Sequence, residues 1–157
     1  KAILELERRL SSELNARCPD ELSISRTALQ LCKALNAAAL SRLHSDFVDE
    51  ALVLLRKAEV LIPEKGPADP FLAVTFNNMA CCLRRKGKPR MALQYLQKAR
   101  EVEEASGPLA ADPSSTMLNL CAVLSELGRH AAALEQARAA AEILQEEVAR
   151  SGAGGGG

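Results

Sequence analysis

The sequence contains few aromatic residues, no tryptophan and no excess of charge of either sign. Its 157 residues include three phenylalanines and one tyrosine, and 20 basic residues are balanced by 20 acidic ones. Without net basicity, the composition does not favour binding to nucleic acid or to an anionic membrane surface. No apolar run approaches the roughly 20 residues that a membrane helix needs, and no signal peptide is visible. We therefore expect neither a nucleic-acid nor a membrane partner.

The motifs that usually mark an active site are also absent from the sequence. Outside the glycine-rich tail 151–157 it has no GxGxxG run, and it has no GxxxxGK, HExxH or GxSxG, the patterns that bind phosphate, hold zinc or expose a nucleophilic serine. His44 and His130 are its two histidines, and a lone imidazole without a partner base is weak evidence for acid–base catalysis. We expect no catalytic, cofactor-binding or metal-binding residue, and hence no enzyme.

Five cysteines occur without metal-ligand spacing. Because their number is odd and no CxxC pair is present, neither a disulfide framework nor a zinc site is expected. Packed thiols indicate a reducing compartment, so we expect a cytoplasmic protein, with cytoskeletal or ciliary association left open. The cysteines are Cys18, Cys32, Cys81, Cys82 and Cys121.

The stretch from 71 to 104 carries the pattern around which the chain is organised. Apolar residues at i, i+3, i+4 and i+7 predict a first helix with one apolar face, formed by Phe76, Met79, Ala80 and Leu83. Gly87 ends this helix and Pro89 begins a second one. There the same spacing recurs at Ala92, Leu93, Leu96 and Ala99. The pattern predicts an antiparallel helical hairpin.

The hairpin pattern recurs at a shift of 41 residues in both directions. Toward the C-terminus, the matching positions are Asn119, Leu124, Gly128, Ala133, Leu134 and Ala140; toward the N-terminus they are Asn36, Ala39, Ala51, Leu52, Leu55, Lys57 and Ala58. We therefore predict three hairpins within 20–150, at about 22–62 (copy one), 69–105 (copy two) and 112–150 (copy three). An aspartate followed by proline predicts the capped start of a helix, and this pair occurs at Asp69-Pro70 and Asp112-Pro113. Pro63 is expected to end copy one.

Copy one departs from the pattern at its turn. Asp46 stands at the glycine position and Arg42 where the other copies have leucine. We expect Asp46 to act as the N-cap of a helix over 48–61.

Both ends of the sequence lie outside the three hairpins. Residues 1–18 predict an N-terminal helix, over 2 to about 17, that is either a cap or the second helix of a truncated repeat. The last helix, about 130–150, carries an apolar stripe that leaves self-association open, formed by Leu134, Ala137, Leu144 and Val148. The glycine-rich tail 151–157 is expected to be flexible.

The recurring pattern of a small residue, a larger apolar residue, glycine and paired alanines resembles the tetratricopeptide repeat. NNMA followed by KGK, and NLCA followed by LGR, are similar to the longer repeats of kinesin light chain. The resemblance implies an all-α fold, an α–α superhelix of three antiparallel hairpins plus the N-terminal helix. It also implies that His130 packs in its turn, where the family often has an aromatic ring.

The resemblance further implies a protein-binding groove along the first helices of the hairpins. Many peptide-binding members carry an asparagine nine residues before the turn glycine, where its amide can bond a peptide backbone. Asn78 and Asn119 occupy that position, and Asn77 precedes the first of them. The alternative is that these asparagines bond between neighbouring helices.

The densest charge in the chain lies around Gly87. Arg84 and Arg85 are expected at the groove edge, where guanidinium groups would select an acidic partner segment. The alternative is a solvated run, offset by the acidic residues Glu101, Glu103 and Glu104.

Two further residues are candidates for the groove. Lys33 matches the lysine of the carboxylate clamp in chaperone-binding members, and His44 is expected to face the groove. The rest of the clamp is missing, because Ala37 and Ser115 stand at two of its positions.

These observations predict a scaffold or adaptor module that binds an extended, acidic or neutral peptide or a helix of a protein partner. The alternative is a structural subunit that docks through its convex face or terminal helices, with no peptide in the groove.

Overall fold

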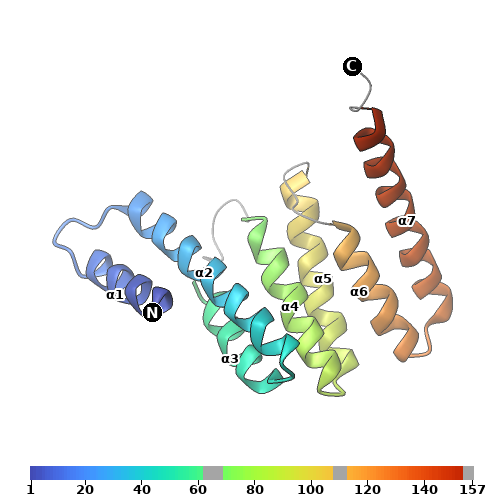
Figure 1. Ribbon diagram of the computed structural model, residues 1–157, viewed down its shortest axis with the longest axis horizontal. Coiled ribbons are helices and arrows are strands. Elements are labelled where there is room, and N and C mark those ends of the chain that lie inside the picture. Colours follow the sequence, from blue (N-terminus) through green and yellow to red (C-terminus); the bar gives the residue numbers. More distant parts are fainter. Residues whose placement is uncertain (62–68, 108–112, 154–157) are drawn as a thin grey trace.

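A computed structural model describes residues 1–61, 69–107 and 113–153. These residues form seven helices in a row, as Figure 1 shows. They are α1 (Ala2–Leu14), α2 (Glu21–His44), α3 (Val48–Glu59), α4 (Phe71–Arg85), α5 (Pro89–Ser106), α6 (Pro113–Glu126) and α7 (His130–Ala153). The predicted all-α class is confirmed, with the helices packed in sequence as in a tetratricopeptide superhelix. None of the described helices is long and apolar enough to cross a membrane.

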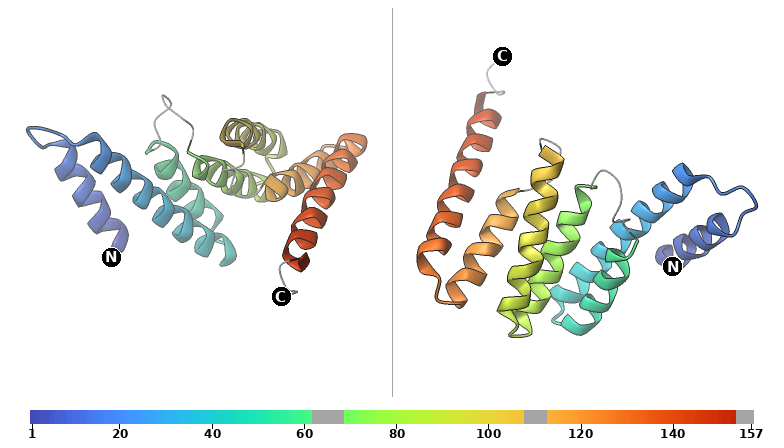
Figure 2. Two further views of the ribbon diagram at one scale, coloured as in Figure 1. Left: turned by 90° about the horizontal axis from the view of Figure 1, so that it is seen from above. Right: turned by 180° about the vertical axis from the view of Figure 1, so that it is seen from behind.

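Helices that follow one another in sequence pack against each other (Figures 1 and 2). Three hairpins result, α2–α3, α4–α5 and α6–α7, and α1 packs on α2 as α3 packs on α4. The first helices of the hairpins also touch, α2 with α4 and α4 with α6. Between the described residues of α3, α5 and α7 there is no such contact. The stack therefore curves with α2, α4 and α6 on its inner side.

Small side chains allow the helices to approach closely. Alanines fill the contact planes within and between hairpins, and larger residues pack around them in a core that continues from α2 to α7. The alanines with at most 1% exposure are Ala39, Ala51, Ala58, Ala80, Ala92, Ala99 and Ala140. Most of the predicted apolar positions are buried or partly buried, but Leu134 of copy three is 51% exposed, because no described helix packs on that side of α7.

A second cluster attaches α1 to the first hairpin. Leu10 of α1 packs with Leu31 and Leu35 of α2 and with Ala58 of α3. This contact removes apolar surface from water at the N-terminal end of the stack.

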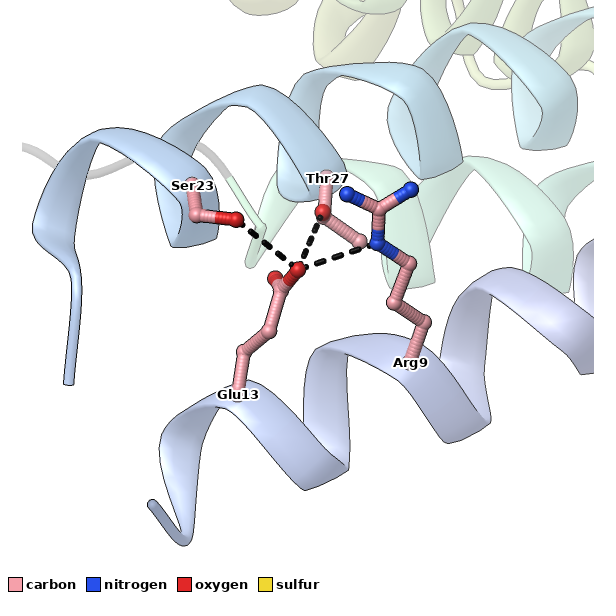
Figure 3. A network of polar contacts seen from close by, with 4 residues as sticks. All are labelled: Arg9, Glu13, Ser23 and Thr27. Atoms are coloured by element: carbon pink, nitrogen blue, oxygen red, sulfur yellow. Dashed lines mark hydrogen bonds and ion pairs between the residues drawn. The ribbon is translucent and has the colours of Figure 1, made fainter. Parts of the chain in front are cut away.

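A polar network accompanies this contact (Figure 3). Oε1 of Glu13 accepts hydrogen bonds from Arg9 (3.0 Å), Ser23 (2.9 Å) and Thr27 (3.1 Å). Burial raises the pKa of the Glu13 carboxyl, but the hydrogen bonds from Arg9, Thr27 and Ser23 outweigh it and hold this pKa below its ordinary value of 4.5. Glu13 therefore joins α1 to α2 in its ionised form.

The three hairpin turns have the same geometry. Asp46, Gly87 and Gly128 adopt φ of 64°, 68° and 73°. Each donates its N–H to a carbonyl three residues earlier, and the next residue bonds a carbonyl five residues earlier. The N-cap of α3 is Phe47, without a side-chain cap bond. The predicted N-cap role of Asp46 is therefore wrong, because Asp46 occupies the left-handed position that glycine fills in copies two and three.

The predicted ends of the helices agree only in part with the structure. Asp69 accepts the N–H of Phe71 at 2.8 Å, as a capping aspartate does, and Pro113 begins α6. Asp112 and Pro63 lie outside the described residues. α1 ends at Leu14, earlier than predicted, whereas α7 continues to Ala153 and includes the first three residues of the predicted tail.

Candidate binding surface

Asparagine side chains join the first two hairpins. Asn36 of α2, which is 2% exposed, donates Nδ2–H to Oγ1 of Thr75 at 2.9 Å. Its Oδ1 accepts a hydrogen bond from Nδ2 of Asn78 at 2.9 Å. The buried amide of Asn36 thus bonds two side chains of α4. Without these partners, the buried amide would lower the stability of the fold.

The same arrangement joins the second and third hairpins. Asn77 of α4 donates to Oγ1 of Thr116 and accepts from Nδ2 of Asn119 at 3.0 Å. Thr116 in turn donates to a carboxylate oxygen of Glu103 on α5. Asn77, Thr116 and Asn119 lie 41 residues after Asn36, Thr75 and Asn78. The network therefore repeats with the period of the fold.

This network corrects one predicted binding residue. Asn77 is 8% exposed, and both ends of its amide bond to α6, so it is not available to a ligand. Asn78 and Asn119 are half-buried, and each donates one N–H between helices, as the alternative interpretation predicted. Within the described part of the chain, their Oδ1 atoms have no hydrogen-bond partner. The sequence also contained a sign of the network that we missed, the 41-residue spacing of Thr75 and Thr116.

Arg84 and Arg85 bind the neighbouring hairpins. Nη1 of Arg84 lies 2.8 Å from Oε1 of Glu126 on α6. Nη1 of Arg85 donates to the Leu43 carbonyl at the end of α2 at 2.6 Å and lies 3.7 Å from Asp46. Glu101, Glu103 and Glu104 were predicted to neutralise the charge of the two arginines. This is wrong, because Arg84 and Arg85 pair with residues of the neighbouring repeats. Such exposed pairs contribute up to about 1 kcal/mol each.

Lys33, near the middle of α2, and His44, its last residue, are both exposed. Nζ of Lys33 lies 5.7 Å from the centre of the Phe71 ring, a cation–π distance. His130 is exposed as the first residue of α7, so its predicted packing role is wrong. The turn at Gly128 directs the chain so that the ring stays outside the core.

One set of accessible residues on α2, α4 and α6 forms aligned rows with the 41-residue period. We call these rows the inner stripe. From the N-terminal to the C-terminal ends of the helices, the rows are Lys33, Val74 and Ser115; Ala37, Asn78 and Asn119; Leu40, Cys81 and Ala122; and His44, Arg85 and Glu126. The predicted residues Lys33, His44, Asn78, Asn119 and Arg85 thus belong to the inner stripe, whereas Asn77 and Arg84 do not.

The cysteines have packing roles in this surface and beneath it. Burial raises the pKa of Cys32 and raises that of Cys82 to about 11. Burial also raises the pKa of Cys81, against the opposing effect of Arg84 and Arg85. These thiols stay protonated near neutral pH and are poor metal ligands. No group of three or more potential metal-binding side chains occurs in the described parts of the chain.

Comparison with known proteins agrees with this geometry. Residues 30–105 match the family model of the tetratricopeptide repeat, so this part of the chain consists of such repeats. The fold is similar to the crystal structure of YrrB, a TPR protein with an unusual peptide-binding site, with a TM-score of 0.52 and 23% sequence identity. That match covers 90% of this chain and 61% of YrrB. A search of curated proteins finds no significant match.

Proposed function

We propose that the protein binds an extended segment of a protein partner along the inner stripe. The observation that carries this proposal is the alignment of Asn78 and Asn119 on adjacent inner helices. Each amide is oriented by its bond to the preceding hairpin, and its carbonyl oxygen has no hydrogen-bond partner among the described residues. Such preorganised acceptors can bind the backbone N–H groups of a peptide without further ordering. The repeat family and the peptide-binding site named for YrrB support this reading.

The neighbouring rows suggest what such a segment carries. Leu40, Cys81 and Ala122 form a row of small or apolar side chains, which fits a modest apolar residue of the ligand. Lys33 lies beyond the asparagines at one edge, and Arg85 at the other favours acidic flanking residues. Arg84 stays a link between hairpins in this proposal. The protein then acts as an adaptor without catalysis.

The experiment blocks the stripe without touching the asparagine network. Ala37→Arg combined with Ala122→Arg places two long side chains on the stripe, both at accessible alanines. Val53→Arg combined with Val60→Arg adds the same charge at exposed residues of the first hairpin, away from the stripe, and serves as the control. Partners are captured from lysate by crosslinking, and their segments are then synthesised and titrated against each variant. We expect the stripe variant alone to lose binding; equal binding by all variants would exclude the stripe.

A second candidate is a structural subunit that docks through its terminal helices. It is favoured by the apolar residues that α7 exposes, among them Leu134 at 51% and Val148 at 72%. Retention of partners by the stripe variant would support it. The kinesin-light-chain subtype and a cytoplasmic location, with cytoskeletal or ciliary association, stay predictions; the free cysteines support only the location.

A further inference from the structure

The outer face of α7 is more apolar than the same face of α5 in the second hairpin. In copies one and two, Leu52 and Leu93 help to form the core that the next hairpin joins. Leu134 occupies their position in copy three and is 51% exposed. Where α5 has Arg100 and Glu103, α7 has Ala141 and Leu144. Two positions that are charged in copy two are thus apolar on the hairpin whose outer face is uncovered in the described structure.

The polar contacts between hairpins also end at this face. Leu118 stands where copies one and two have Asn36 and Asn77, and it is 50% exposed. Leu144 stands where Glu103 accepts a hydrogen bond from the next hairpin. Single exposed leucines are ordinary, but a continuous apolar row is typical of an interface. The face is therefore suited to an apolar partner rather than to another repeat with its asparagines.

The spacing of the apolar row is symmetric about its centre. Leu134, Ala137, Ala141 and Leu144 are separated by three, four and three residues, so the row reads the same in both directions. A second α7 running antiparallel meets it with Leu134 against Leu144, and with Ala137 against Ala141. Large residues then pack at both ends and small ones at the centre, where they let the helix axes approach.

We propose that two copies of this chain associate through α7 in an antiparallel, two-fold symmetric contact. A self-complementary patch of this kind closes into a dimer and does not propagate. α7 has 24 residues and α6 has 14, so the end of α7 that carries Leu144 and Val148 extends beyond its hairpin partner. This dimer face lies apart from the inner stripe, and each can therefore be tested without the other.

The contact predicts a weak dimer, because one helix from each copy provides most of the buried area. We expect a Kd on the order of 10 µM, measurable by analytical ultracentrifugation between about 1 and 500 µM. Ala141→Arg with Leu144→Glu restores the residue types that α5 carries at these positions, so the hairpin is expected to fold. This variant should weaken the dimer by about 100-fold or more. The control, Val53→Glu with Val60→Arg, removes one exposed valine on α3 and another at its C-cap, and should leave the Kd unchanged.

Crosslinking tests the direction of the helices. In a background with the exposed Cys18 replaced by serine, Ala137→Cys and Ala141→Cys proteins are mixed and oxidised with copper phenanthroline. The antiparallel contact predicts that mixed disulfides form faster than disulfides between identical variants. Faster formation of identical pairs would overturn the proposed arrangement. A wild-type chain that stays monomeric at the highest concentration would overturn the dimer itself, as would a dimer that the Ala141→Arg and Leu144→Glu changes leave intact.

Discussion

The two ends of the helical stack differ in how their outer helices are held. At the N-terminal end, α1 packs Leu10 into the core and bonds α2 through Glu13. At the C-terminal end, α7 is held by its own hairpin partner on one side, and its other side presents Leu134, Leu144 and Val148 to solvent. One end is therefore completed by apolar and polar contacts within the chain, whereas at the other no described residue covers these apolar side chains.

The largest difference between the ends is expected from leucine truncation. Leu10→Ala should lower the free energy of unfolding by about 2–4 kcal/mol, because a buried side chain is removed from a packed cluster. Leu144→Ala, tested at a concentration where the chain is monomeric, should change it by less than about 0.5 kcal/mol. Urea unfolding followed by circular dichroism measures both. A large loss in the Leu144 variant would mean that α7 is already covered within the monomer.

The second comparison concerns equivalent positions inside the stack and at its end. Asn77→Ala should cost about 1–3 kcal/mol, because it leaves Thr116 and Asn119 without their buried partner. Leu118→Ala changes the matching position of copy three, which is half exposed, and should be nearly neutral. Both are measured by urea unfolding. Equal effects would indicate that Asn77 contributes by packing rather than by hydrogen bonding.

The N-terminal end should also depend on pH. The folded-state pKa of Glu13 is lowered, so its ionised form stabilises the fold above its unfolded pKa, near 4.5. This contribution is lost as the pH falls through the still lower pKa of the folded state. Thermal unfolding from pH 7 to pH 3 should therefore show wild type more stable than Glu13→Gln at neutral pH, with the difference shrinking in acid. A constant difference would assign the role of Glu13 to geometry rather than charge.

The repeat was predictable from sequence because packing constrains residue size at a fixed period. Alanines, leucines and turn residues recur every 41 positions, and these same residues form the core and the turns. The period also placed Lys33, Asn78 and Asn119 on one surface. Residues whose role depends only on helical spacing were thus accessible to sequence analysis.

The partners of the polar residues were not predictable in the same way. Asn77 and Asn78 are adjacent in sequence, and a turn of about 100° on the helix separates a buried bridge from an accessible side chain. Arg84 and Arg85 bind groups about 42 residues away, on the neighbouring hairpins, although acidic residues lie closer in sequence. Such choices depend on how the hairpins are rotated against one another, which residue spacing within one helix does not specify.

The smallest expected effect concerns the turn of copy one. Asp46 holds φ at 64°, the left-handed region that glycine occupies in the turns of copies two and three. Asp46→Gly should therefore stabilise the fold by about 0.5–1 kcal/mol, even though it removes the exposed contact with Arg85. Gly128→Asp makes the reverse change at the matching turn and should destabilise by a similar amount. Urea unfolding of both variants measures the two changes. If Asp46→Gly were destabilising, the ion pair with Arg85 would contribute more to stability than the backbone strain at Asp46 costs. The turn of copy one would then be stabilised by an ion pair, and that of copy three by the conformational freedom of glycine.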